Sequence, residues 1–173
     1  NLLMKKEYMY LAGGAVAALV GSKFLSAKKD ITNTEAKDFV NKWIKTVNEN
    51  NPIGYGVVGL TQEQVSKATG AVTNLYCKDA VLVSTVGDVI YTGIPEITGY
   101  FDSFLSSEPQ GTLNSISVQN FGDVVVANGN YTFILFDIDE GESEVYARFT
   151  YVLKRASNGV IKIQTHHSSA QPE

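Results

Sequence analysis

The stretch SNGVIKIQTHHSS, residues 157–169, decides the fold of this 173-residue chain. Its Asn158-Gly159 pair supplies the positive φ angles of a tight hairpin turn, so the strand that follows runs antiparallel to the strand before it. After the turn, apolar Ile161 and Ile163 alternate with polar residues, which is the period of a strand with one buried face. The chain is therefore predicted to end in a β-hairpin.

Further strands are predicted upstream of this hairpin. Residues 112–120, 123–137 and 144–155 are rich in β-forming residues, and each segment is joined to the next by a turn that contains glycine. Residues 79–84 and 88–92 predict two shorter strands. Long strands that follow one another through short turns indicate an antiparallel meander in the C-terminal half.

Three helices are predicted before this meander. The first begins near Thr34, with Asn33 or Thr34 as its N-cap, because apolar residues then recur at three- and four-residue steps. The second runs from the capping box Thr61-x-x-Gln64 to about residue 76, and the third opens at Pro95, a favoured first helical position. Helices first and an antiparallel meander last define an α+β domain.

A different kind of segment precedes the domain. Residues 8–25, YMYLAGGAVAALVGSKFL, are almost wholly apolar and have lysines on both sides. As a helix they span roughly 27 Å, close to the thickness of a bilayer core. We expect a transmembrane anchor here, with a signal-peptide core and a buried globular helix as alternatives. The predicted organisation is an anchor over residues 1–30 and one folded domain over residues 31–173.

Composition excludes several functions. The chain has 14 Lys+Arg against 18 Asp+Glu and a net charge of −4, which gives no basic footprint for nucleic acid. Cys77 is the only cysteine, so an intrachain disulfide is impossible, and its thiol is expected to be inert. One cysteine and two adjacent histidines do not make a structural zinc spacing. We expect neither a metal ion nor a cofactor.

The adjacent histidines of the last strand are the first candidates for chemistry. Plain alternation places Thr165, His167 and Ser169 on the inner face together with the isoleucines. A β-bulge would exchange the two sets and turn His166 and Ser168 inward. Neighbouring side chains on a strand point apart, so the two histidines cannot chelate one ion. One satisfied core histidine beside one solvated histidine is the structural alternative.

Two other side chains could contribute to a pocket. Tyr100 borders the apolar face of the third helix, where its hydroxyl could reach a half-buried cavity or its ring could simply pack. Arg148, on the strand before the hairpin, could bind an oxyanion or serve as a surface charge. Its neighbours Phe149 and Tyr151 lie on the opposite face and are predicted to be core residues.

From about Thr34 to Glu173 the chain resembles the NTF2-like superfamily, which includes the calcium/calmodulin-dependent kinase association domain and the iota class of carbonic anhydrases. The resemblance depends on the run His-His-Ser-Ser with a proline close behind it, and on three further segments. These are AVLVST (80–85), ITGYFDSFLSSEPQG (97–111) and NGNYTF (128–133). It implies a cone made of three helices and a curved antiparallel sheet.

The resemblance also implies a site at the wide mouth of the cone. The matching positions are Thr85, Tyr100 and the run His166, His167, Ser168 and Ser169. Val83-Ser84 stands where many members have Lys-Pro before the threonine, which makes Thr85 the weakest match. The implied chemistry needs no metal: a histidine accepts a proton from water, while hydroxyls hold that water and stabilise developing bicarbonate.

Three hypotheses for function remain open at this stage. The first is a membrane-tethered iota-type carbonic anhydrase that interconverts CO2 and bicarbonate. The second is a non-catalytic accessory or scaffold subunit of an integral membrane complex, such as a photosynthetic one. The third is another NTF2-like enzyme, an isomerase or cyclase that acts on an apolar ligand. By analogy, the resemblance suggests a plastid thylakoid before a mitochondrial membrane, and it makes a homodimer possible.

Overall fold

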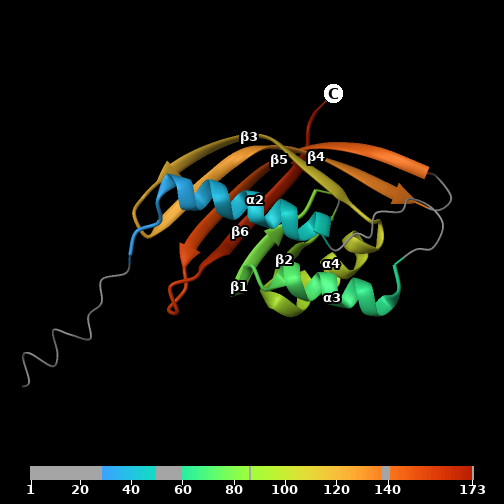
Figure 1. Cartoon of the computed structure of the whole chain (residues 1–173), viewed down its shortest axis with the longest axis horizontal. Coiled ribbons are helices and arrows are strands. Elements are labelled where there is room, and N and C mark those ends of the chain that lie inside the picture. The colour runs from blue at the N-terminus through green and yellow to red at the C-terminus, as the bar shows by residue number, and fades with distance from the viewer. Residues whose placement is uncertain (1–28, 50–59, 86, 138–140, 173) are drawn as a thin grey trace, which may run out of the picture.

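The computed structural model describes residues 29–49, 60–85, 87–137 and 141–172. Three helices and six strands are formed by these residues (Figure 1). In chain order they are α2 (Asn33–Glu49), α3 (Gln62–Thr73), β1 (Tyr76–Val83), β2 (Ile90–Thr92), α4 (Gly93–Ser106), β3 (Gln110–Asn120), β4 (Val124–Asp137), β5 (Gly141–Arg155) and β6 (Ile161–Ala170). The predicted α+β class is confirmed.

The six strands form one sheet in the order β2-β1-β6-β5-β4-β3. Strands β3 to β6 are the predicted antiparallel meander, and Gly159 in the last turn has a φ of +83°, as its hairpin requires. The prediction of a wholly antiparallel sheet is wrong in one place, because β1 pairs with β6 in parallel. The backbone of Ile163 donates to Leu75 at the end of α3, so β1 starts beside the start of β6 and runs the same way.

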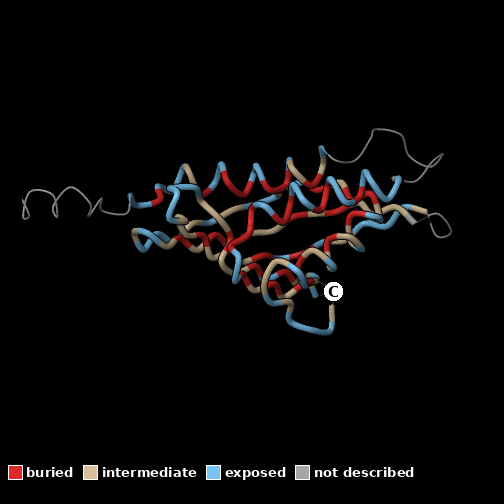
Figure 2. Tube along the Cα trace, turned by 90° about the horizontal axis from the view of Figure 1, so that it is seen from below, coloured by how far each residue is buried: buried red, intermediate tan, exposed pale blue. Residues whose placement is uncertain are grey.

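The helices lie on one side of the curved sheet (Figure 1). Helix α2 packs against β3 and β4, α4 packs against β1, and α3 packs against α4. Buried residues concentrate where helices and sheet face each other, and the opposite sides of both layers are exposed (Figure 2). Trp43 of α2 sits at the centre of this layer, with ring contacts to Phe101, Tyr131, Phe133 and Tyr151. The apolar face of α2 that carries Trp43 therefore covers the part of the sheet where residues are buried.

Helix ends follow local capping chemistry more closely than apolar periodicity. The capping box of Thr61 and Gln64 is confirmed. At α2 the cap is neither Asn33 nor Thr34: Thr32 and Glu35 exchange reciprocal backbone and side-chain hydrogen bonds of 2.9 and 3.1 Å. Helix α3 ends at residue 73 rather than 76, because the chain there enters β1, and α4 begins two residues before Pro95.

The start of α2 is tied to the far end of β5. The Arg155 guanidinium donates to the backbone carbonyls of Lys29 and Asp30 at 2.9 and 3.0 Å, and it pairs with Glu35 at 3.0 Å. Hydrogen bonds from the Thr32 backbone and from Arg155 lower the pKa of Glu35 to about 2.

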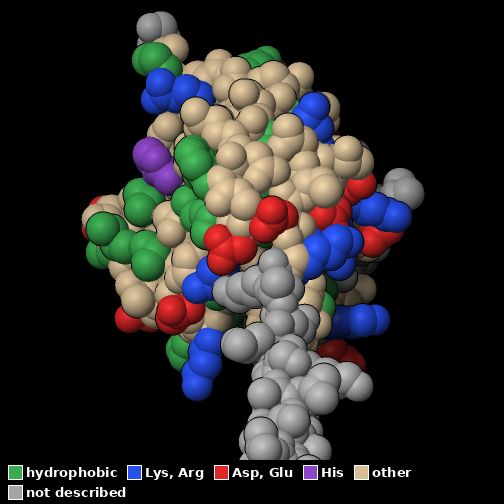
Figure 3. Space-filling model, turned by 90° about the vertical axis from the view of Figure 1, so that its left-hand side faces the viewer, with side chains coloured by type: hydrophobic (Ala, Val, Ile, Leu, Met, Phe, Trp, Pro, Cys, Tyr) green, Lys and Arg blue, Asp and Glu red, His purple; other side chains and the backbone are tan. Residues whose placement is uncertain are grey.

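Figure 3, which looks at this end of the domain, shows acidic and basic side chains interspersed on the surface rather than gathered by sign.

The predicted anchor over residues 8–25 lies outside the described residues. Among the helices that the structure does describe, none is long and apolar enough to cross a membrane.

A close approach inside the sheet gives the first prediction. A Cβ atom on Gly129 of β4 would lie 2.0 Å from the Ser115 carbonyl oxygen and 2.7 Å from the Phe149 ring, whereas one on Gly70 of α3 meets nothing within 4 Å. We expect Gly129→Ala to lower the free energy of unfolding by about 3 kcal/mol, because backbone and a buried ring must both move. Gly70→Ala should raise it by roughly 0.5–1 kcal/mol through helix propensity. Urea titrations of both variants measure the difference, and equal stability would contradict this packing.

Candidate functional site

A β-bulge in β6 determines which of the two adjacent histidines, His166 or His167, points into the core. Val152 and Leu153 are consecutive on β5 but pair with Thr165 and Ile163, which leaves Gln164 as an extra residue on β6. Beyond it His166 and Ser168 are buried, at 3% and 4% exposed, whereas His167 is exposed. The expectation from plain alternation, with His167 and Ser169 inward, is wrong, and the structure has the bulge alternative.

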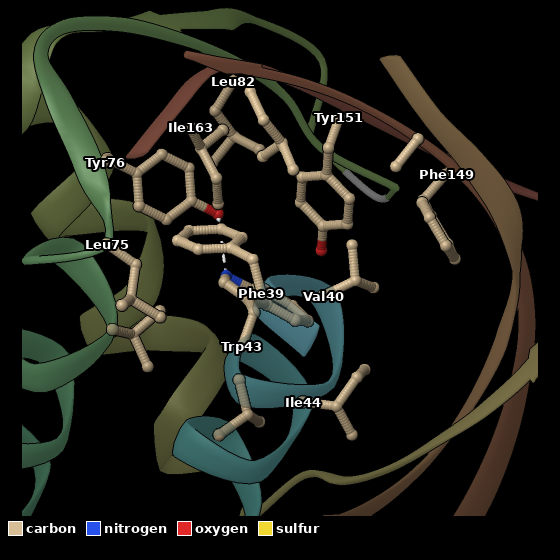
Figure 4. Packing of buried hydrophobic residues seen from close by; sticks show 14 of the residues in the cluster. Phe39, Val40, Trp43, Ile44, Leu75, Tyr76, Leu82, Phe149, Tyr151 and Ile163 are labelled. Atoms are coloured by element: carbon tan, nitrogen blue, oxygen red, sulfur yellow. Dashed lines mark hydrogen bonds between the residues drawn. The ribbon is translucent and has the colours of Figure 1, made fainter. Parts of the chain in front are cut away.

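One ring nitrogen of His166 is bound to a chain of buried aromatic donors. Its Nδ1 lies 2.8 Å from the Tyr76 hydroxyl, and that hydroxyl accepts a hydrogen bond of 3.2 Å from the indole Nε1 of Trp43. Figure 4 shows the bond between Tyr76 and Trp43 inside the packed core. The imidazole also lies against the ring of Tyr151, with centroids 4.3 Å apart, and against Trp43 edge to face. The ring is therefore held on several sides.

The other side of His166 faces a group of hydroxyls. Its Nε2 lies 3.5 Å from the Tyr131 oxygen, which is long for a hydrogen bond. The Tyr131 hydroxyl donates to Ser168 Oγ, and Ser168 forms a short hydrogen bond with Thr85. These three hydroxyls come from β4, from β6 and from the bend that follows β1, so the sheet brings together residues that are up to 83 positions apart.

A small cavity adjoins this group. Its volume is about 60 Å³, and its walls are mostly apolar. The polar side chains that line it are Trp43, Ser84, Thr85, Tyr100, Tyr131, His166 and Ser168. At roughly 30 Å³ for each water, it has room for about two waters or one molecule of a few heavy atoms.

A wider surface groove of about 710 Å³ lies between α4 and the β1–β2 connection. It shares Tyr100, Phe104 and Leu135 with the small cavity. Tyr100 and Phe104 stack with their planes 8° apart, so two parallel rings stand between the groove and the cavity. Tyr100 therefore belongs to the entrance of the pocket as well as to its wall.

Burial keeps the ionisable groups of the pocket neutral. It lowers the pKa of His166 to about 3, and the nearby charge of His167 acts in the same direction. Burial also raises the pKa of Tyr76 and of Tyr131, and it raises that of Tyr100 to about 12. At neutral pH the pocket thus presents an uncharged imidazole and protonated hydroxyls.

The structure brings four of the predicted site residues together: Thr85, Tyr100, His166 and Ser168 line one cavity. His167 and Ser169 lie on the outer face of β6, opposite Thr150 and Arg148 of β5. Arg148 donates there to Ser169 Oγ at 3.3 Å, away from the cavity. Among the residues described, no three His, Cys, Asp or Glu side chains are placed to hold a metal ion.

Three residues of the site were missed by the sequence reasoning: Trp43, Tyr76 and Tyr131. Trp43 was recognised only as part of an apolar helical stripe, and Tyr76 only as a helix end. Tyr131 lies within NGNYTF, one of the segments that carry the resemblance, and alternation with Ala127 and Phe133 on β4 could have placed it inward.

Comparison with known proteins defines the class of this domain. Residues 65–172 match the family described as the calcium/calmodulin dependent protein kinase II association domain, and the chain belongs to that family. A crystal structure assigned to this family from Xanthomonas campestris is 29% identical, with a TM-score of 0.67, and the match covers 85% of this chain and 96% of that one.

Two more distant structures share the fold. An NTF2-like protein of unknown function from Pseudomonas putida is 15% identical, with a TM-score of 0.61, over 81% of this chain and 87% of that one. A ketosteroid isomerase-like protein from Erwinia carotovora is 13% identical, with a TM-score of 0.59, over 79% and 94%. The domain is thus an NTF2-like fold of the association-domain type. The search of curated proteins gives no match.

The buried imidazole predicts a pH dependence of stability. The pKa of His166 falls from an ordinary 6.5 to about 3 in the folded chain, so below pH 6.5 the unfolded chain binds a proton that the folded chain does not. Stability is complete above pH 6.5 and is lost as the pH falls towards 3. Between pH 6 and pH 5 we expect the free energy of unfolding to fall by about 1 kcal/mol. Glu35 does not contribute in this window, because its stabilisation is lost only below pH 4.5.

The matched variants are His166→Gln and His167→Gln, compared by urea titration at pH 6 and pH 5. His166→Gln should lose the part of the fall in unfolding free energy between pH 6 and pH 5 that His166 contributes, and His167→Gln should keep it. If His166→Gln does not fold, NMR titration of the wild-type imidazole replaces it. An imidazole that titrates near pH 6.5 in the folded chain would contradict the burial described.

Proposed function

We propose that the domain interconverts CO2 and bicarbonate in the small pocket around His166, as an iota-type carbonic anhydrase would. The observation that carries this proposal is the size and polarity of the pocket: about 60 Å³, with apolar walls and a cluster of neutral hydrogen-bond donors at one side. An isomerase or cyclase ligand would need several hundred Å³, which the small cavity alone does not offer. CO2 suits the apolar walls, and bicarbonate offers acceptor oxygens to the donors.

The proposal gives His166 a different role from the one expected at first. A general base works best with a pKa near the working pH, and His166 is held far below it with Nδ1 already bonded to Tyr76. In our proposal His166 acts through Nε2 as a neutral donor that stabilises charge on a substrate oxygen. Tyr131 lies on the same side of the ring, and its hydroxyl orients Ser168 through the hydrogen bond that it donates.

The proton released from water then leaves through hydroxyls. In the step CO2 + H2O → HCO3⁻ + H⁺, the water oxygen bonds to carbon while its proton passes to Ser168 Oγ. Ser168 hands its own proton to Thr85, to which it is already hydrogen-bonded, and Thr85 passes one to a buffer base in solution. Each hydroxyl is restored, and charge and atoms balance.

The second candidate is a non-catalytic accessory subunit, and one observation favours it. Most polar groups of the cluster already have a partner within the protein: Trp43 and Tyr76 are bonded in series to His166 Nδ1, and Tyr131 and Thr85 are both bonded to Ser168, as in a largely satisfied core. The family is described as an association domain, which fits a scaffold on a membrane complex. Catalysis measurements separate the two candidates.

The test of the enzyme is CO2 hydration by stopped flow, with the wild type assayed before and after exhaustive chelation. We expect the rate to survive chelation. His166→Ala should lower it by roughly 10²- to 10³-fold, the usual loss for one donor to a developing oxyanion. His167→Ala, its neighbour on the outer face, should change it less than twofold.

Three outcomes would count against the enzyme. A folded wild type with no rate above background, with or without divalent metal, would leave the accessory role. A rate lost on chelation and restored by metal would overturn the mechanism proposed above. If His167→Ala lowered the hydration rate as much as His166→Ala, the reaction would not depend on the pocket.

We further propose that residues 1–30 tether the domain to an organelle membrane, a plastid thylakoid before a mitochondrial one. The apolar run of residues 8–25 supports this. Residues 1–30 fused to a soluble fluorescent reporter should carry it into the membrane fraction and resist carbonate extraction. A reporter that stays in the supernatant would contradict the tether.

A further inference from the structure

The hydrogen bonds around His166 have a direction, and Trp43 sets it. The indole N–H of Trp43 can only donate, so the Tyr76 oxygen is an acceptor in that bond. The hydroxyl hydrogen of Tyr76 is buried and needs an acceptor of its own. Of the two side chains bonded to this hydroxyl, only His166 Nδ1 can accept it.

This direction determines where the imidazole carries its proton. A neutral histidine has one N–H and one acceptor nitrogen. Because Nδ1 accepts from Tyr76, the proton is on Nε2, the nitrogen that faces Tyr131. The 3.5 Å to that oxygen is long, so the N–H remains available for a shorter bond to a guest in the adjoining cavity.

The packing prevents the ring from reversing this arrangement. His166 is 3% exposed, it lies 4.3 Å from the Tyr151 ring, and its own plane is 80° from that of Trp43. Tyr151 lies against the imidazole, but its hydroxyl forms no hydrogen bond in the described structure. Tyr76 is therefore the hydroxyl that orients Nδ1.

We propose that Trp43 and Tyr76 are positioning residues that hold His166 in the tautomer with its proton on Nε2, so that the pocket presents an N–H donor to a small oxyanion. The tautomer follows from geometry alone, whereas the naming of bicarbonate as that anion rests on the function proposed above. Neither aromatic residue need touch the ligand. Their effect reaches it through the imidazole.

The direct test is nitrogen NMR of the ring in the full ¹⁵N-labelled chain. Long-range ¹H–¹⁵N correlations distinguish a protonated ring nitrogen from an unprotonated one. In the wild type we expect Nδ1 of His166 to be unprotonated and Nε2 to be protonated. In Tyr76→Phe, where Nδ1 loses its donor, we expect the proton to redistribute onto Nδ1.

Tyr151→Phe is the matched control. It removes another hydroxyl beside the same imidazole, but one without a hydrogen bond, so the tautomer should not change. Protonated Nδ1 in the wild type would overturn the proposal. So would an unchanged tautomer in a folded Tyr76→Phe. If that variant does not fold, the wild-type spectrum decides.

Anion binding provides the second readout. Titration with ¹³C-bicarbonate, followed by NMR, should give about tenfold weaker binding for Tyr76→Phe than for Tyr151→Phe. Equal bicarbonate affinities of the two variants would overturn the claim that the tautomer supports binding of the anion. A wild type with the Nε2 proton and bound bicarbonate but no CO2 hydration would refute the proposed enzyme and leave the positioning role standing.

Discussion

Strand β6 contains one residue more than regular pairing with β5 allows, and the side chains beyond it are turned by this bulge towards the helices. Gln164, the extra residue, donates through its side chain to the Asp79 carbonyl at 3.2 Å. Ile163, just before it, donates to the Leu75 carbonyl at 2.9 Å. On the other side, the pairing with β1 also shifts between Tyr76 and Val81. The bulge is thus held from the side of β1, and the identity of the inward histidine depends on it.

The same residues that stabilise the core also define the pocket. Trp43 is central to the packing between α2 and the sheet, and its only donor is used to orient the Tyr76 hydroxyl. Burial keeps the His166 ring neutral, and the lowered pKa makes this imidazole a weak general base at neutral pH. In the function proposed above, the imidazole therefore donates a hydrogen bond, and the hydroxyls relay a proton. A large change in the core should therefore alter ligand binding as well as stability.

Local rules were enough for much of the fold. The Asn-Gly turn, the Thr61–Gln64 capping box and the apolar stripe of α2 each act over a few residues, and the sequence shows all of them. The parallel pairing of β1 with β6 could not be predicted in this way, because it joins segments about 80 residues apart. The bulge has no glycine to mark it, so the alternation of Ile161 and Ile163 extended naturally to the wrong histidine. Tyr100 was found from its place on the apolar face of the third helix and Thr85 through the resemblance, whereas Trp43 and Tyr76 have the sequence signature of ordinary core residues.

The central claim is that the inward face of β6, beyond the bulge, forms a donor pocket for a small oxyanion. A crystal structure of the protein grown or soaked in bicarbonate tests it most directly. The account predicts one anion in the cavity, with an oxygen within hydrogen-bond distance of His166 Nε2 and another near the hydroxyls of Ser168 and Thr85. An empty or purely hydrated cavity, with the anion bound instead at Arg148 and His167 on the outer face, would contradict it.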